Sequence, residues 1–132
     1  MSEKTWNNAL RNFIWSTLIK LAKKKKNCYY SDIVCNIYER FGVSLPNEIG
    51  YLLGPIMYYC QKNKLPPLTS LIVNKKYGIP GDGLTTCVIP NKEQLKKVYK
   101  RVFAYEWEKI QNPFARYNFK NSLSKMIDQK RR

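Results

Sequence analysis

Residues 65–83 read LPPLTSLIVNKKYGIPGDG, and this stretch decides the expected fold class. Pro66 and Pro67 end any preceding helix, because proline lacks a backbone N–H and its ring clashes with the turn before it. The apolar, β-branched run 68–73 that follows predicts a strand. Three glycines and a proline at 78–83 predict a turn, and a second strand-like run covers 84–89. Together they predict a β-hairpin with a basic tip.

Three helices are expected before this hairpin. Residues 6–23 place apolar side chains at helical spacing, namely Trp6, Leu10, Phe13, Ile14, Leu18 and Leu21. This first helix ends in a lysine run, after which Asn27 can take a left-handed cap. In the second helix Ser31 is the expected cap and Gly42 the expected terminator, with an inward face of Val34, Ile37, Tyr38 and Phe41.

The third helix is expected over residues 46–62, with Pro46 in its first turn. Its expected core face is Ile49, Leu52, Leu53, Ile56 and Cys60. Pro55 lies in the middle, so the helix is either kinked there or broken in two, and the sequence leaves this choice open.

A fourth helix is expected to begin at Asn91 and to close at Asn112-Pro113. Its apolar positions are Leu95, Val98, Tyr99, Val102 and Trp107, and lysines cover its other side. Residues 1–112 are therefore expected to form a single domain, and residues 113–132 a basic C-terminal helix or tail.

The composition favours an acidic partner. The chain has 132 residues with 24 Lys+Arg against 9 Asp+Glu, a net charge of +15, which indicates nucleic acid, with duplex DNA expected. It has 0 histidines, which excludes catalysis and metal binding by histidine. We expect no cofactor and no metal, and no enzymatic activity.

The cysteines and the chain start point to a reducing compartment. Cys28, Cys35, Cys60 and Cys87 lack any C-x-x-C pair, so buried reduced thiols are expected rather than a zinc site. The first residues lack the apolar run of a signal peptide, and the longest uncharged middle stretch is too short to span a bilayer. A cytoplasmic protein is expected.

The order of three helices and a hairpin resembles winged helix-turn-helix DNA-binding domains, an α+β fold. The residues that carry the resemblance are Tyr29-Tyr30-Ser31-Asp32-Ile33, Leu45-Pro46, Gly50, Gly54, Leu65-Pro66-Pro67-Leu68, Gly78, Gly81 and Gly83. Within that class the layout is similar to the DNA-binding half of alkylguanine-DNA alkyltransferases. Their reactive Pro-Cys-His-Arg motif is absent, so the resemblance implies DNA docking without alkyl transfer. Three segments also look like parts of small prophage and mobile-element proteins, which implies a regulator or accessory role. They are Leu65-Pro66-Pro67-Leu68-Thr69, Val73-Asn74-Lys75-Lys76 and Phe103-Ala104-Tyr105-Glu106-Trp107.

The resemblance makes residues 46–62 the expected recognition helix and residues 74–83 the basic wing. Asparagine can pair with adenine, and tyrosine and lysine can reach phosphate or sugar. The residues expected to contact nucleic acid are Asn47, Tyr51, Tyr58, Lys62, Lys75, Lys76, Tyr77, Lys24 and Lys25. For the third-helix tyrosines, packing against the first and fourth helices is an equally open alternative.

Two other functions stay open. Ten tyrosines suit a protein interface as well as DNA, so the chain could be an accessory or inhibitor that binds a protein through a winged-helix surface. A metal-dependent nuclease would need the carboxylates of Asp82, Glu93, Glu106 or Glu108 near Lys96. A metal-free ribonuclease using lysine, arginine and tyrosine is the remaining enzymatic alternative.

Overall fold

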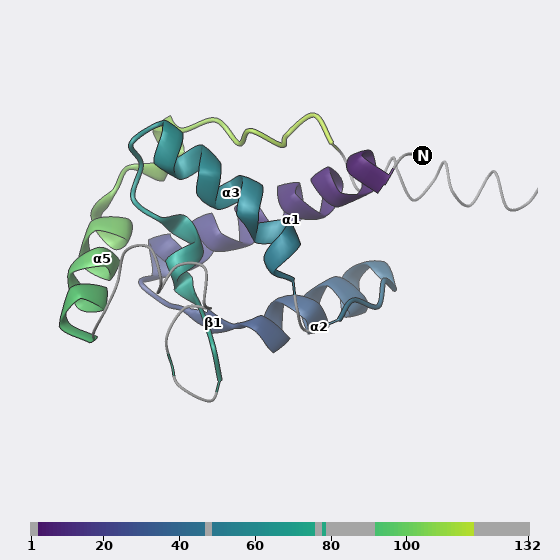
Figure 1. The fold of residues 1–132 in the computed structure, drawn as a ribbon, viewed down its shortest axis with the longest axis horizontal. Helices are drawn as coiled ribbons and strands as arrows, with labels where there is room; N and C mark the ends of the chain where they lie inside the picture. Colours follow the sequence, from purple (N-terminus) through teal and green to yellow (C-terminus); the bar gives the residue numbers. More distant parts are fainter. Residues whose placement is uncertain (1–2, 47–48, 76–77, 79–91, 118–132) are drawn as a thin grey trace, which may run out of the picture.

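The computed structural model describes residues 3–46, 49–75, 78 and 92–117. The elements in chain order are α1 (Glu3–Lys24), β1 (Cys28–Tyr29), α2 (Tyr30–Phe41), α3 (Gly50–Lys62), η1 (Leu68–Leu71), β2 (Ile72–Val73), α5 (Lys92–Ala104) and η2 (Trp107–Lys109). The fold is α+β and mostly helical, as expected (Figure 1).

Helix α1 is the centre of the molecule. Helices α3 and α5 and the 3-10 turn η1 all pack against it. Its residues Leu10, Ile14 and Leu18 are fully buried. On α3 the expected core face is buried throughout, at Ile49, Leu52, Leu53, Ile56 and Cys60. The helical periodicity therefore predicted the inner face of the α3 segment correctly and that of α1 in part, since Trp6, Phe13 and Leu21 are only half-buried while the buried Trp15 was not predicted.

Helix α2 differs from the prediction at its start and on one face. Tyr29, not Ser31, is the N-cap, and the Asp32 carboxylate accepts a hydrogen bond from the Tyr29 N–H at 2.9 Å. Ile33 and Ile37 are buried, whereas Tyr38 is 59% exposed. One residue past Ile37 is a rotation of about 100°, which carries Tyr38 off the inner face. Gly42 ends the helix in the left-handed conformation at φ +71°, as expected.

Helix α3 begins later than predicted and is continuous. It starts at Gly50, whereas the exposed Pro46 precedes it in irregular backbone. Pro55 lies inside the helix, so the alternative of two separate helices is wrong.

The predicted strand 68–73 is mostly a 3-10 turn. The Ser70 N–H donates to the Pro67 carbonyl at 3.0 Å, so the two prolines start a turn instead of an extended run. Only β2 is extended, and it pairs in parallel with β1, Ile72 opposite Cys28. A parallel pair requires a long connection, here α2 and α3, and is not a hairpin. The expected second hairpin strand, 84–89, lies outside the described residues.

The chain after α5 folds back over α1. Helix α5 stops at Ala104, short of the predicted helix end, and Trp107 lies in η2. The Trp107 indole N–H donates to the Val102 carbonyl at 2.8 Å, and its ring meets Trp15 edge-on at 6.2 Å. Residues 105–117 then run along the α1 and α3 side of the molecule (Figure 1), where Asn112 donates to Asn12 at 2.7 Å. Residues 118–132 lie outside the described part.

Candidate nucleic-acid interface

The end of α1 presents four exposed lysines in a tight turn. Lys25 takes the left-handed conformation at φ +56°, where the sequence predicted Asn27. The Lys25 N–H donates to Ala22 at 3.1 Å and the Lys26 N–H to Leu21 at 3.0 Å, the pattern of a Schellman cap. The N–H groups of the turn therefore cap the last carbonyls of α1. The side chains of residues 23–26 remain in solvent.

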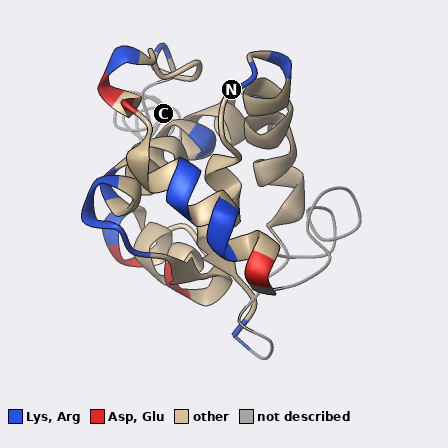
Figure 2. Cartoon of the chain, turned by 90° about the vertical axis from the view of Figure 1, so that its left-hand side faces the viewer, with Lys and Arg blue, Asp and Glu red and all other residues tan. Residues whose placement is uncertain are grey.

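Helix α5 adds a second set of cations beside this turn. Leu95 and Val102 are buried, while Lys96, Lys97, Lys100 and Arg101 are exposed. Figure 2 looks onto this side of the molecule, where lysine and arginine predominate. We call the combined set the basic end: Lys23, Lys24, Lys25, Lys26, Lys96, Lys97, Lys100 and Arg101. Glu93, exposed in the first turn of α5, lies on this same helix face, one turn before Lys96 and Lys97.

The structure separates the expected contact residues of α3. Tyr51, Tyr58 and Lys62 share one exposed stripe, because their spacing follows the helical repeat. The carboxyl end of α3 lies on the same side of the molecule as α5 and the end of α1 (Figure 1). Lys24 and Lys25 belong to the basic end. Lys62 is the last residue of α3 and lies at the carboxyl end of that helix. Tyr51 lies about 16 Å away along the helix.

The sequence left open whether the tyrosines of the third helix contact a partner or pack against neighbouring helices, and the structure shows both cases. Tyr59 packs edge-on against Trp15, with ring centroids 5.7 Å apart. Tyr51 and Tyr58 are 49% and 64% exposed. The prediction of core packing is thus confirmed for Tyr59, while Tyr51 and Tyr58 are accessible to a partner.

Of the expected wing, residues 74–83, the structure describes Asn74, Lys75 and Gly78, and Lys75 is the expected contact residue among them. It follows β2, and its ammonium lies 5.9 Å from the ring centroid of Tyr29 on β1. Exposed cation–π contacts of this kind are weak and leave the lysine charge in solvent. Asn47, Lys76 and Tyr77, also expected to contact nucleic acid, lie outside the described residues.

Three residues outside the expected contact set have roles that the structure makes visible. Arg11 on α1 donates to the backbone of α3, and Tyr99 and Phe103 on α5 line a hollow of about 550 Å³ beside Lys25. Aromatic residues at i and i+4, with Lys100 and Arg101 between them, were a signal for the hollow. Arg11 gave no signal, because its partners are backbone carbonyls far away in sequence.

The acidic residues bear on the nuclease alternative. Within the described residues there is no group of three or more acidic, cysteine or histidine residues that could hold a metal ion. Glu106 forms an exposed ion pair with Lys109, three residues later. Asp82, the remaining expected nuclease carboxylate, lies outside the described part of the chain.

The cysteines match the expectation only in part. Cys28, Cys35 and Cys60 are free thiols, and Cys60 is buried. Cys35 is exposed, so the prediction of buried thiols is wrong there, because residue 35 lies on the outer face of α2. Cys87 is outside the described residues.

Over the described residues, none of the helices has both the length and the apolar character needed to cross a membrane. Comparisons with protein-family models, with curated proteins and with solved structures give no match.

Proposed function

We propose that this protein is a non-enzymatic nucleic-acid-binding protein with duplex DNA as its ligand. One observation supports the proposal most strongly: the lysines that end α1 and the cations on α5 lie side by side at the basic end. Lysine and arginine supply most non-specific binding energy for DNA, by neutralising phosphates and releasing counterions. A single helix with one charged face would be an ordinary solvated surface, whereas two elements extend the basic area.

The winged-helix mode of docking is the finer part of the proposal. In it, α3 enters the major groove with Tyr58 and Lys62, and Lys75 contacts the flanking backbone. The exposed stripe on α3 favours this arrangement. The parallel pairing of β1 with β2 does not, since a wing is a hairpin. A regulator or mobile-element accessory role would follow from such docking.

A protein partner is the second candidate function. Tyr38, Tyr51 and Tyr58 are exposed large side chains, and tyrosine is enriched at protein interfaces. This candidate predicts no saturable binding to nucleic acid.

The test is fluorescence anisotropy of a labelled random-sequence duplex, titrated with protein at salt concentrations from about 50 to 300 mM. If about five to eight phosphates are met, the log–log salt slope should lie near −4 to −7. Lys100→Gln should flatten the slope by about 1. The matched control is Lys4→Gln, which removes one exposed charge about 30 Å away, near the start of α1, and should leave the slope unchanged.

Two outcomes would overturn the proposal. Absence of saturable binding at the lowest salt would move the function to a protein partner. Cleavage of the DNA in a parallel sample that contains Mg²⁺ would favour the metal-dependent nuclease instead.

A further inference from the structure

The hollow beside the basic end has the size of a small-molecule site. Its volume is about 550 Å³, and its lining residues are Lys25 from the turn after α1 and Lys96, Tyr99, Lys100, Phe103 and Ala104 from α5. Ligand pockets commonly span about 300 to 1,000 Å³. The space is therefore sufficient for a planar base with its sugar.

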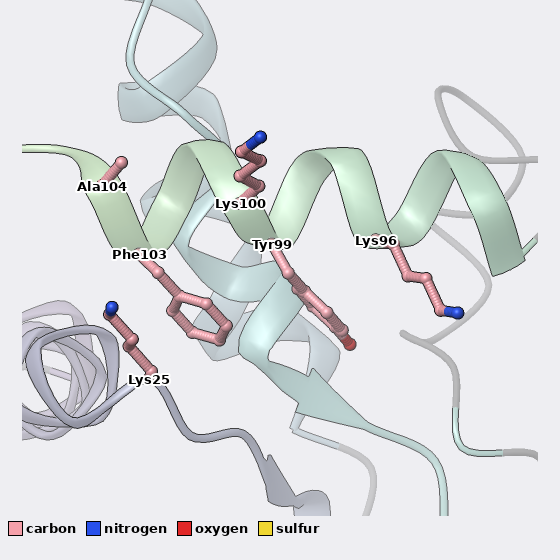
Figure 3. A pocket seen from close by; sticks show the side chains of 6 residues that line it. All are labelled: Lys25, Lys96, Tyr99, Lys100, Phe103 and Ala104. Carbon is pink, nitrogen blue, oxygen red and sulfur yellow. The ribbon is translucent and has the colours of Figure 1, made fainter.

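Two aromatic rings form one wall. Tyr99 and Phe103, one helical turn apart, have ring centroids 5.9 Å apart and planes inclined by 27°. Both side chains are half-buried, so part of each ring reaches solvent. In Figure 3 Phe103 extends from α5 toward the turn that carries Lys25, and Phe103, Tyr99 and Lys96 all extend from the same side of α5. A flat ring entering between Lys25 and Phe103 would have an aromatic face on one side and a cation on the other.

The Tyr99 hydroxyl is a polar group in need of a partner. Its oxygen is buried and makes no hydrogen bond of ordinary geometry within the described part of the chain. Burial raises the pKa of Tyr99, and the nearby Asn27 side chain offsets part of that rise. The hydroxyl is therefore neutral at physiological pH and can both donate and accept.

The rim of the hollow is cationic. Lys25, Lys96 and Lys100 all line it, and none of its lining residues is acidic. Lys100 extends from the opposite side of α5 from Tyr99 in Figure 3. It is thus placed to meet a phosphate outside the hollow while the base lies inside. An apolar aromatic wall with cations at its border is typical of surfaces that bind single-stranded nucleic acid.

We propose that this hollow binds an unpaired nucleobase of a single-stranded nucleic acid, which stacks on Phe103 while Lys25, Lys96 and Lys100 hold the neighbouring phosphates. The inference rests on the nucleic-acid-binding part of the proposed function, and not on the choice of duplex DNA, because the same basic end would bring the strand in. It goes further by assigning a base-stacking site and a single-stranded ligand. An acidic peptide would satisfy the lysines but would leave the aromatic wall unused.

The test compares three labelled ligands at one ionic strength. They are an oligothymidine of about twelve nucleotides, an abasic deoxyribose-phosphate chain of the same length, and a blunt duplex. The parent protein should bind oligothymidine at least about fivefold more tightly than the abasic chain, because a base stacked on an aromatic ring contributes measurably. Phe103→Leu should abolish that difference. Its affinities for the abasic chain and for the duplex should stay within about twofold of those of the parent protein.

A second variant keeps the test decisive if Phe103→Leu does not fold. Thermal melting of Phe103→Leu would reveal such misfolding. Ala104 is exposed at the rim, so Ala104→Leu narrows the mouth without touching the core. It should weaken oligothymidine binding in the same direction as Phe103→Leu. Lys4→Gln again serves as the control that should not alter the ratio between oligothymidine and abasic chain.

The outcomes separate the two proposals. Equal binding of oligothymidine and abasic chain by the parent, or a ratio unchanged by both hollow variants, overturns the stacking site even if the duplex binds. Oligothymidine binding that depends on Phe103, with no duplex binding, supports the stacking site and overturns the duplex proposal. Absence of binding to all three ligands overturns both.

Discussion

The Arg11 side chain on α1 donates from Nη2 to the carbonyl oxygen of Tyr51 on α3 at 2.8 Å. This carbonyl would ordinarily accept a hydrogen bond from the residue four positions later, which is Pro55 and has no N–H. The Nε of Arg11 also donates to the Leu52 carbonyl at 3.0 Å, and Nη1 donates to Asn8 at 2.8 Å. Arg11 thus supplies a donor that proline removes and connects α3 to α1.

Arg11→Met should destabilise the protein by about 1 kcal/mol, because the partly buried Leu52 carbonyl and the exposed Tyr51 carbonyl lose their donor. The cost should be smaller in a Pro55→Ala background, where the new amide can donate to Tyr51. Urea denaturation of the parent, both single variants and the double variant measures this coupling. An equal cost of Arg11→Met in both backgrounds would show that Arg11 does not compensate for the proline.

The adjacent residues Tyr58 and Tyr59 should respond to substitution in opposite ways. Tyr59→Ala should cost about 2 kcal/mol of stability, because it leaves a gap against the Trp15 ring. Tyr58→Ala should change stability by no more than about 0.5 kcal/mol, because this side chain is 64% exposed.

If α3 enters the major groove, Tyr58→Ala should alter the sequences selected from a random duplex pool. If the Tyr58→Ala variant is as stable as the parent and selects the same DNA sequences, α3 is not the recognition helix. Tyr51→Ala, at the far end of the same stripe, tests how much of α3 the DNA covers.

Helix faces were predictable from the sequence because burial follows the helical repeat. The five inner positions of α3, and Leu10, Ile14 and Leu18 on α1, required only the spacing of apolar residues. The strand prediction at 68–73 failed because apolar, β-branched residues suit any buried backbone, and Pro67 started a turn whose hydrogen bonds depend on packing. The partner of β2 lies more than forty residues earlier in the chain, and no local pattern could indicate it.

The candidate site was predictable only as a set of charges. The lysine runs at 23–26 and along α5 are visible in the sequence, but that they adjoin depends on how α5 packs against α1. The left-handed turn at Lys25 was missed because asparagine is the usual residue for that conformation, and Asn27 was close by. Tyr99 was predicted as a residue of the apolar face, and Phe103 was assigned no role, since helical spacing alone cannot distinguish a buried face from the wall of a hollow.

Lys75 should contribute to duplex affinity through charge alone. Lys75→Ala should weaken binding to every sequence and flatten the salt slope by about 1. The control is Tyr29→Leu, which removes the ring 5.9 Å from the Lys75 ammonium but keeps the charge, and it should leave the slope unchanged. Unchanged binding by Lys75→Ala would exclude the segment after β2 from the interface.

The stability of the protein should fall at alkaline pH through Cys28. Burial, and secondly the Asp32 carboxylate, raise the pKa of this thiol from 9.0 to about 12. Between these values the unfolded chain has already lost the proton that the folded chain retains, so unfolding becomes easier as pH rises. The contribution of Cys28 is complete below pH 9 and lost by about pH 12. Cys28→Ala should reduce this dependence in urea titrations across that range.

The same thiols should differ in their rate of alkylation. Only the thiolate reacts with iodoacetamide, so Cys28 and Cys60, whose pKa values burial raises, should be protected at pH 8. Cys35 is exposed on α2 and should be modified first. Peptide-resolved mass spectrometry over time measures each rate, and the urea-unfolded chain, in which all thiols are accessible, is the control. Labelling of Cys28 as fast as Cys35 in the folded protein would show that the contact between β1 and β2 opens readily, since this pair buries Cys28 opposite Ile72.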